Sequence, residues 1–223
     1  FRERHVDGLI IATAQRKDSV IDECCAEGTP FVLAVRASTD IGVSSVVSDE
    51  NVGANMVISH LAQLGHTKIA HVAGPQFYST GFERHQGFLQ GMQNAGLNPD
   101  PELIAFCDAF TEEEGRRATS KLLAMRKKFT AIFAANDMLA LGVYDELEAD
   151  GIRCGTDISV VGFDDIPAAS LTTPPLTTVM QDITGAGAAL VETLIAQIDG
   201  RETAPRKLPG KLVVRASSGA AEA

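Results

Sequence analysis

Two adjacent carboxylates, Asp164 and Asp165, close a short run of β-branched and aromatic residues at 159–163. Such a run is typical of a strand that is buried on both faces of a parallel sheet. Ligands of open α/β sheets bind at the carboxyl ends of the strands, so these acids are placed for small-molecule recognition. Because neighbouring residues of a strand point to opposite faces, we expect only one of the two acids to face a ligand.

Polar or aromatic residues also follow the other predicted strands. They are Asp49 after 44–47, Thr80 and Arg84 after 68–73, Phe110 after 103–106, and Asn136 after 131–135. Carboxylates accept hydrogen bonds from hydroxyl groups, amides and guanidinium groups donate them, and a phenyl ring offers a flat apolar face. This combination suits a small polar ring compound, such as a sugar or a nucleobase derivative.

Each of these residues also has a structural interpretation. Asp49 could cap the helix predicted from Asn51, and Asn136 with Asp137 could form the cap and first turn of the next helix. The two acids at 164–165 could form a turn, and Phe110 could belong to the core. Arg84 lies near the start of a helix, where the dipole disfavours a cation, so we expect it to have an acidic partner or a ligand.

The chain alternates between predicted strands and helices, which indicates parallel sheets with helices on both faces. Predicted strands lie at 6–12, 31–35, 44–47, 68–73, 103–106, 131–135, 159–163 and 211–216, and predicted helices at 51–64, 82–95, 111–126, 137–149 and 183–198. In the last helix we expect a buried face formed by Ile183, Gly187, Leu190, Leu194 and Ile198.

Composition restricts the function classes further. The 223 residues carry a formal net charge of −10, which argues against direct binding of the chain to a nucleic-acid backbone. Four cysteines without a Cys-x-x-Cys pair indicate free thiols in a reducing compartment, and hence a cytoplasmic protein. No apolar run reaches transmembrane length.

No motif of an enzyme or a cofactor site is present. The sequence has no Gly-x-Gly-x-x-Gly, Walker loop or Gly-x-Ser-x-Gly, and its five histidines show no recognised metal spacing. We therefore expect no catalysis, no cofactor and no metal. The chain opens on Phe1, so we expect it to be a fragment of a longer protein.

Five segments together resemble the lactose-repressor/galactose-repressor family of transcriptional regulators. They are Gly-His-Thr-Lys-Ile-Ala-His-Val-Ala-Gly-Pro at 65–75, Arg-His-Gln-Gly-Phe at 84–88, Ala-Asn-Asp-Met-Leu-Ala-Leu-Gly at 135–142, the segment 157–165, and Pro-Pro-Leu-Thr-Thr-Val at 174–179. The resemblance runs from about residue 6 to residue 219.

The resemblance implies an α/β fold of two Rossmann-like lobes, of the periplasmic-binding-protein-like type I, with the effector between the lobes. The expected N-terminal lobe comprises 1–64 and 183–204, and the expected C-terminal lobe comprises 65–182 and 205–223. Family members begin with a helix-turn-helix, a hinge helix and the first strand and helix of the N-terminal lobe. None of these is recognisable here, so we expect an N-terminal lobe that is incomplete at its start.

Residue by residue, Arg84, Asn136 and Asp164 match the principal effector contacts of the family. The remaining matches are Thr80 as a polar contact, Phe110 as a ring that stacks on the ligand, Asp49 near the cleft, and Gln181 close to a crossover between lobes.

The implied function is ligand sensing in a bacterial regulator, a repressor. A small polar effector, foremost a sugar or sugar derivative and otherwise a nucleobase or nucleoside, would change operator affinity. The implied partners are that effector, a second copy of the chain in a homodimer, and operator DNA through a module missing here; no membrane is involved. The rival interpretations are an extracytoplasmic solute-binding protein for sugar transport and an enzyme.

Overall fold

The computed structural model describes residues 6–40 and 42–221, which form two compact units. The first unit contains the residues up to Asp49 together with Phe77–Thr80 and Asp182–Pro209, and the second contains Glu50–Gln76, Gly81–Gln181 and Gly210 onward. Residues 1–5 and 222–223 of the expected lobes, His5 among them, lie outside the described residues.

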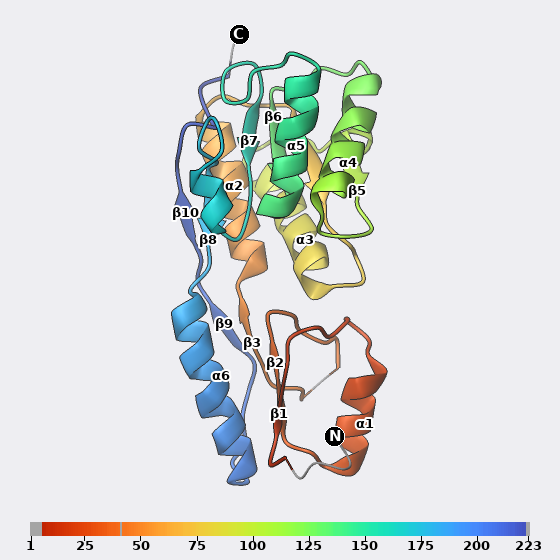
Figure 1. Ribbon diagram of the computed structural model, residues 1–223, viewed down its shortest axis with the longest axis vertical. Coiled ribbons are helices and arrows are strands. Elements are labelled where there is room, and N and C mark those ends of the chain that lie inside the picture. Colours follow the sequence, from red (N-terminus) through yellow and green to blue (C-terminus); the bar gives the residue numbers. More distant parts are fainter. Residues whose placement is uncertain (1–5, 41, 222–223) are drawn as a thin grey trace. The chain divides into compact units, whose positions relative to one another are not determined.

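The first unit is a parallel sheet with one helix on each face (Figure 1). The strand order is β1 (Leu9–Ile11), β2 (Phe31–Ala34), β3 (Ser45–Ser48) and β9 (Arg206–Leu208). Successive residues of a strand alternate between faces. Phe31 and Leu33 therefore pack with helix α1 (Ser19–Glu27), whereas Val32 packs with helix α6 (Ile183–Ile198).

One α-helix and two strands of the described structure were not predicted. Helix α1 begins where the Asp18 side chain accepts a hydrogen bond from the Val20 N–H (3.0 Å) and ends at Gly28, whose φ is 66°. Strand β9 and strand β8 (Thr178–Met180) were also missed. All three are short, and β9 exposes two charged residues, so each gives a weak hydrophobic pattern.

The predicted buried face of α6 is wrong at three positions. Ile183 is 75% exposed, Ile198 is 43% exposed and Gly187 is exposed. The helix instead packs through Ala186, Ala189, Leu190, Thr193 and Leu194, which follow the three- and four-residue spacing of one helix face.

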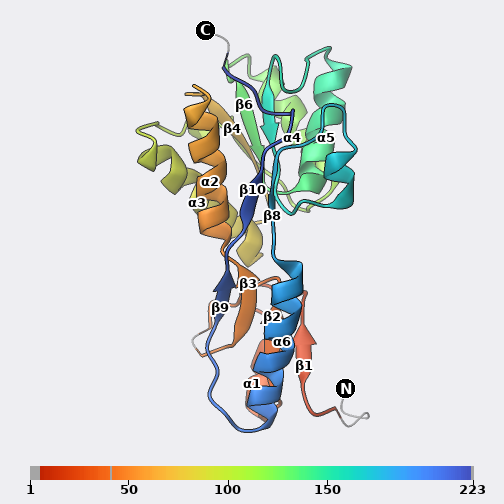
Figure 2. The ribbon, with the colours of Figure 1, turned by 90° about the vertical axis from the view of Figure 1, so that its left-hand side faces the viewer.

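The second unit is a parallel sheet with two helices on each face (Figure 2). Its strand order is β5 (Ile104–Phe106), β4 (Ile69–Ala73), β6 (Ala131–Ala134) and β7 (Ser159–Val161). The helices are α2 (Glu50–Gln63) and α3 (Ser79–Asn94) on one face, and α4 (Glu112–Ala124) and α5 (Asp137–Ala149) on the other. Strands β8 and β10 (Lys211–Val213) form an antiparallel pair, and two short 3₁₀ helices cover Pro101–Leu103 and Pro167–Ser170.

Two apolar clusters fill the faces of this sheet. One joins α2 and α3 to the sheet through Leu61, Phe88 and Phe133, and the other joins α4 and α5 through Leu122 and Leu139. The alternation of strands and helices predicted from the sequence is therefore confirmed as an α/β fold with parallel sheets.

The compact units differ in their bounds from the expected lobes. Helix α2 shares a core with α3 and β6, so it belongs to the second unit, although the expected boundary follows it at residue 64. Strand β9 pairs with β3 in the first unit, whereas the expected C-terminal lobe resumes at residue 205. The units change between Asp49 and Glu50, between Gln181 and Asp182, and between Pro209 and Gly210.

Two histidines of the second unit are buried and contact other residues of the fold. His66 is 2% exposed, and its Nδ1 and Nε2 lie 2.8 Å and 3.0 Å from the Thr130 hydroxyl and the Gly219 carbonyl oxygen. His71 is fully buried and its Nδ1 lies 2.9 Å from the carbonyl oxygen of Phe133. Within 6–40 and 42–221, no three acidic, histidine or cysteine side chains gather as metal ligands, and no helix has the length and apolarity to cross a membrane.

Helices α4 and α5 approach each other closely at two glycines. A Cβ atom on Gly142 would overlap the carbonyl oxygen of Glu112, and one on Gly115 would overlap that of Leu139. By contrast, a Cβ atom on Gly187, an exposed residue of the second turn of α6, meets nothing within 4 Å. Gly115 and Gly142 are thus required by close helix packing, whereas Gly187 is not.

We expect Gly142→Ala to destabilise the protein by about 1–3 kcal/mol, because the backbone of α4 cannot move aside easily. Gly187→Ala is the matched control and should stabilise by about 0.5–1 kcal/mol, since alanine restricts the unfolded chain without a clash. Urea unfolding followed by circular dichroism measures both changes. If both variants change the free energy of unfolding in the same direction, the close packing at Gly142 is contradicted.

Candidate functional site

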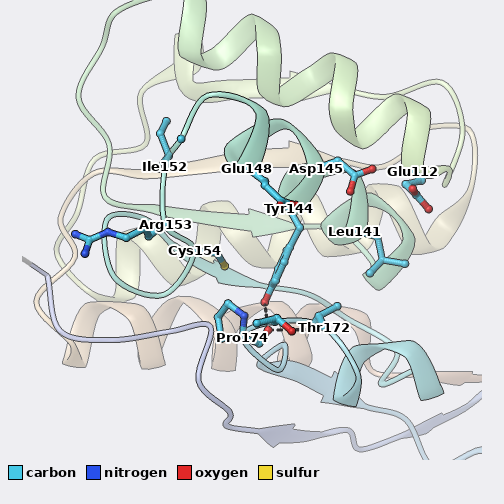
Figure 3. A pocket seen from close by; sticks show the side chains of 12 residues that line it. Glu112, Leu141, Tyr144, Asp145, Glu148, Ile152, Arg153, Cys154, Thr172 and Pro174 are labelled. Carbon is cyan, nitrogen blue, oxygen red and sulfur yellow. Dashed lines mark hydrogen bonds between the residues drawn. The ribbon is translucent and has the colours of Figure 1, made fainter.

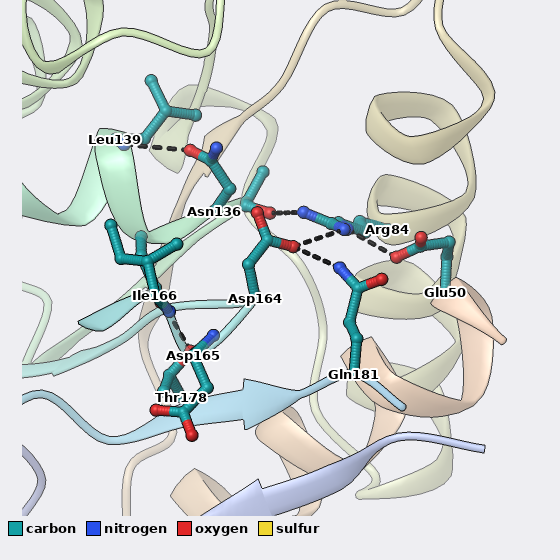
Figure 4. Close-up of polar contacts among 11 residues, drawn as sticks. Glu50, Arg84, Asn136, Leu139, Asp164, Asp165, Ile166, Thr178 and Gln181 are labelled. Atoms are coloured by element: carbon teal, nitrogen blue, oxygen red, sulfur yellow. Dashed lines mark hydrogen bonds and ion pairs between the residues drawn. The ribbon is translucent and has the colours of Figure 1, made fainter. Parts of the chain in front are cut away.

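A buried arginine lies at the carboxyl ends of the strands in the second unit. The side chain of Arg84, in α3, is 3% exposed and contacts three oxygen atoms (Figure 4). Its Nε donates to Glu50 Oε2 (2.6 Å), its Nη1 to the carbonyl oxygen of Ala135 (2.7 Å), and its Nη2 to Asp164 Oδ1 (2.8 Å). The acidic partner expected from the position of Arg84 in its helix is thus present twice.

These partners come from separate elements of the fold. Glu50 is the first residue of α2, Ala135 directly follows β6, and Asp164 follows β7. The guanidinium carbon of Arg84 also lies 3.9 Å from the ring centroid of Phe163, which is 1% exposed. A planar guanidinium suits both contacts, because it stacks on a ring while its edge donates hydrogen bonds.

The acids around Arg84 differ in their electrostatic environment. Burial raises the pKa of Glu50 to about 7, although the neighbouring Arg84 lowers it. Burial alone would lower the pKa of Arg84, but the carboxylates of Asp164 and Glu50 outweigh this effect and hold it above its ordinary value. The side chain of Asp164 is 26% exposed, so it is the acid of this group that water or a ligand can reach.

The second oxygen of Glu50 is unusual. Glu50 Oε1 is buried and has no hydrogen-bond partner within the described part of the chain. A buried carboxylate oxygen without a partner is unfavourable. Glu50 is a site residue that our sequence analysis missed. The available signal was the unfavourable helix position of Arg84, which required an acid from another element.

Asn136 and Asp137 follow β6 and begin α5. Asn136 Oδ1 accepts a hydrogen bond from the Leu139 N–H (2.9 Å), so its capping role is confirmed. Asp137 is fully buried and accepts hydrogen bonds from the Thr178 hydroxyl (2.6 Å) and the Ile166 N–H (2.9 Å). Burial raises the pKa of Asp137 to about 7, against the effect of these two hydrogen bonds.

The adjacent acids Asp164 and Asp165 have different partners. Asp164 Oδ1 accepts hydrogen bonds from Arg84 and from Gln181 Nε2 (Figure 4), whereas Asp165 Oδ1 accepts one from Arg215 Nη2 (2.7 Å). Their φ angles are 112° and 52°, in the region that favours glycine. Strained residues of this kind cluster at functional sites, where the surrounding structure holds them in place.

Phe110 lies beyond β5 and packs against the core of the second unit. Its ring covers Gly74, at the end of β4, so closely that a Cβ atom there would overlap it. Phe110 is only partly buried, so its core contact leaves part of the side chain accessible.

The seven predicted site residues divide between the units. Five of them belong to the second unit: Arg84, Asn136, Phe110, Asp164 and Gln181. Hydrogen bonds join Arg84, Asp164 and Gln181 in one cluster. Asn136 directly follows Ala135, whose carbonyl oxygen accepts a hydrogen bond from Arg84.

Asp49 and Thr80 belong to the first unit. The Asp49 N–H donates to the carbonyl oxygen of Leu208 (2.8 Å), directly before α2. Thr80 lies one turn before Arg84 in α3, and its buried hydroxyl has no hydrogen-bond partner within the described residues. A buried unpaired hydroxyl fits the expected role of a polar contact.

A separate cavity of about 770 Å³ lies beside α5 and contains none of the predicted residues (Figure 3). Two of its hydroxyl groups bond to the same carbonyl oxygen of the cavity wall. The hydroxyl groups of Tyr144 and Thr172 both donate to the carbonyl oxygen of Pro174 at 2.9 Å, and burial raises the pKa of Tyr144. The Arg84 cluster is therefore the stronger candidate, because its chemistry, strain and position at the strand ends coincide.

Asp137 makes stability depend on pH. Its pKa rises from 3.8 to about 7 on folding, so the folded protein keeps a proton that the unfolded chain releases. Stability should therefore fall as pH rises from about 4 to 7, and Glu50 acts in the same direction. We expect Asp137→Asn to reduce this fall in the free energy of unfolding, measured by urea denaturation between pH 5 and 8.

The control for this experiment is Asp157→Asn. Hydrogen bonds from Arg153 lower the pKa of Asp157 to about 2, so it stays ionised throughout this range and its variant should keep the wild-type slope. An Asp137→Asn slope equal to that of the wild type would exclude the proposed coupling.

Known proteins match most of the chain. The model of the periplasmic binding protein-like domain matches residues 58–218. The transcriptional regulator CelR of Thermobifida fusca is 33% identical over 207 residues, which cover 92% of this chain and 61% of CelR. The chain thus spans less than two thirds of the length of this curated relative.

Solved structures agree with this match. A CelR–cellobiose complex has a TM-score of 0.91 at 33% identity and covers 96% of this chain and 66% of that one. The lac repressor dimer bound to operator has a TM-score of 0.87 at 29% identity and covers 96% and 74%. The chain belongs to the periplasmic binding protein-like domain family and corresponds to the effector-binding part of lactose-repressor-family transcriptional regulators.

Proposed function

We propose that this chain is the ligand-sensing domain of a transcriptional repressor and that it binds a sugar or sugar derivative at the Arg84 cluster. The observation that carries the proposal is the pairing of Arg84 with the partly exposed Asp164 at the strand ends. The guanidinium is fixed in place, and the free side of the carboxylate can accept hydrogen bonds from vicinal hydroxyl groups.

The relatives support this class of ligand. CelR has been solved with cellobiose, and a regulator of the same family from Enterococcus faecium has been solved with ribose. Phe110 would add an apolar ring face, and Asn136 and Gln181 would add polar contacts. The relatives are regulators and not transport proteins, which favours the sensor over the solute-binding alternative.

Binding would change the affinity of the intact protein for its operator. A ligand shifts a conformational equilibrium only by its difference in affinity for the two states. A coupling of about 1–3 kcal/mol corresponds to a five- to 150-fold change. We further propose that the intact protein is a cytoplasmic homodimer, since a dimer matches the two half-sites of an operator.

Calorimetry with a panel of cellobiose, ribose, glucose, galactose, adenosine and guanosine tests the proposal. We expect at least one sugar to bind, and Asp164→Asn to weaken its binding by about 10- to 150-fold, because charge-assisted hydrogen bonds contribute about 1.5–3 kcal/mol. Asp164→Asn is preferable to Arg84→Ala, which would leave the buried Glu50 without its cation.

Asp157→Asn serves as the matched control, because Asp157 lies before β7 and Asp164 lies after it. It should bind the sugar with wild-type affinity. Unchanged affinity in Asp164→Asn would remove Asp164 from the site. The bound sugar should also be recovered unchanged after incubation, and its conversion to product would favour the enzyme alternative.

A further inference from the structure

Arg84 has the form of an anion-binding side chain but not the charge environment of one. Anion sites usually present an arginine whose charge is available to a carboxylate or phosphate. Here Glu50 and Asp164 both form ion pairs with Arg84, at 2.6 Å and 2.8 Å. Three of its five N–H groups are already used, by these two acids and by the carbonyl oxygen of Ala135.

Further acidic side chains lie near these ion pairs. Glu83 interacts electrostatically with Glu50, and Asp137, which keeps its proton up to about pH 7, interacts with Asp164 and Arg84. Two carboxyl groups, of Glu50 and Asp164, therefore pair with one guanidinium. An incoming anion would meet a site that is neutral or negative, whereas an uncharged polyol would meet fixed acceptors and the two remaining N–H groups.

Glu50 is the acid that decides this balance. The side chain of Glu50 is 3% exposed and that of Asp164 is 26% exposed, so Asp164 is the acid that a ligand can reach, and Glu50 lies beside Arg84 (Figure 4). Its charge nevertheless acts across the guanidinium, because interactions between charges are strong where water is excluded. Its Oε2 pairs with Arg84, and its buried Oε1 has no hydrogen-bond partner among the described residues.

We propose that Glu50 sets the charge specificity of the site: it compensates Arg84 from within the protein, so the site accepts uncharged polyhydroxy ligands and rejects their carboxylate and phosphate counterparts. This inference rests on the proposed function, since it presupposes a sugar at the Arg84 cluster. It adds a residue that the sequence analysis missed and a chemical limit on the ligand.

Pairs of sugars that differ only in charge test the inference. We choose glucose with glucuronate and galactose with galacturonate, because a uronate keeps one full charge at pH 7.5. Calorimetry at fixed ionic strength should show wild-type binding of at least one neutral member, and at least about tenfold weaker binding of its uronate. Equal affinity of the two members would overturn the inference without touching the proposed function.

The variant Glu50→Gln keeps the size of the side chain and an oxygen acceptor for Arg84 Nε. We expect it to narrow the difference between sugar and uronate by about tenfold or more, since one buried negative charge is removed. If the role of Glu50 is only structural, the variant should bind the sugar and its uronate more weakly by the same factor, and this result would also overturn the inference. Glu50→Leu replaces the carboxyl group by an apolar one. It should change the ratio of the affinities for the sugar and its uronate in the same direction.

The control is Glu146→Gln, which makes the same change of charge in another arginine-paired glutamate of the second unit. Glu146 pairs with Arg116 at 3.2 Å in a pair whose arginine is 60% exposed. This variant should leave the ratio of affinities unchanged. If no member of either pair binds to the wild type, and the wider sugar panel fails as well, the proposed function falls together with the inference.

Discussion

The removal of one guanidinium group from water is the constraint on which the second unit depends. A buried cation is unfavourable unless charge and hydrogen bonds replace its hydration. Arg84 obtains both from Glu50 on α2, from the backbone after β6 and from Asp164 after β7. Because these three groups come from different parts of the chain, one side chain fixes the mutual positions of the elements that carry the site.

The same arrangement separates the roles of the acids. Glu50 and Asp137 are buried, and each has a pKa near 7, whereas Asp164 is partly exposed. Glu50 pairs with the arginine, Asp137 holds the loop after β7 through the Ile166 N–H, and the carboxylate of Asp164 stays partly accessible. The proposed site is thus organised in the absence of a ligand, which would reduce the ordering that binding requires.

The sequence predicted the parts of the fold that have strong local signals. The buried runs that became β4, β6 and β7, the cap at Asn136 and the acidic partner of Arg84 follow from hydrophobicity, capping chemistry and the helix dipole. Glu50 was not predicted, because an acid in the first turn of a helix is ordinary and only tertiary packing places it against an arginine 34 residues later.

The errors have similar causes. Helix α1 has only nine residues. The predicted face of α6 included Ile183 and Ile198 at the helix ends, whereas the buried residues are the smaller Ala189 and Thr193. Which residues contact a ligand remains a prediction, since the pattern of the sequence identifies the strand ends but not the molecule they recognise.

The backbone at Asp164 has a consequence for how the protein can evolve. A φ of 112° would suit glycine better than aspartate, so under the proposed function this position exchanges stability of the fold for recognition. Replacement by glycine would relax the loop and abolish the accessible acid in one step. Selection for thermal stability alone would thus favour a domain without this acid, and the proposed response to a ligand would be lost with it.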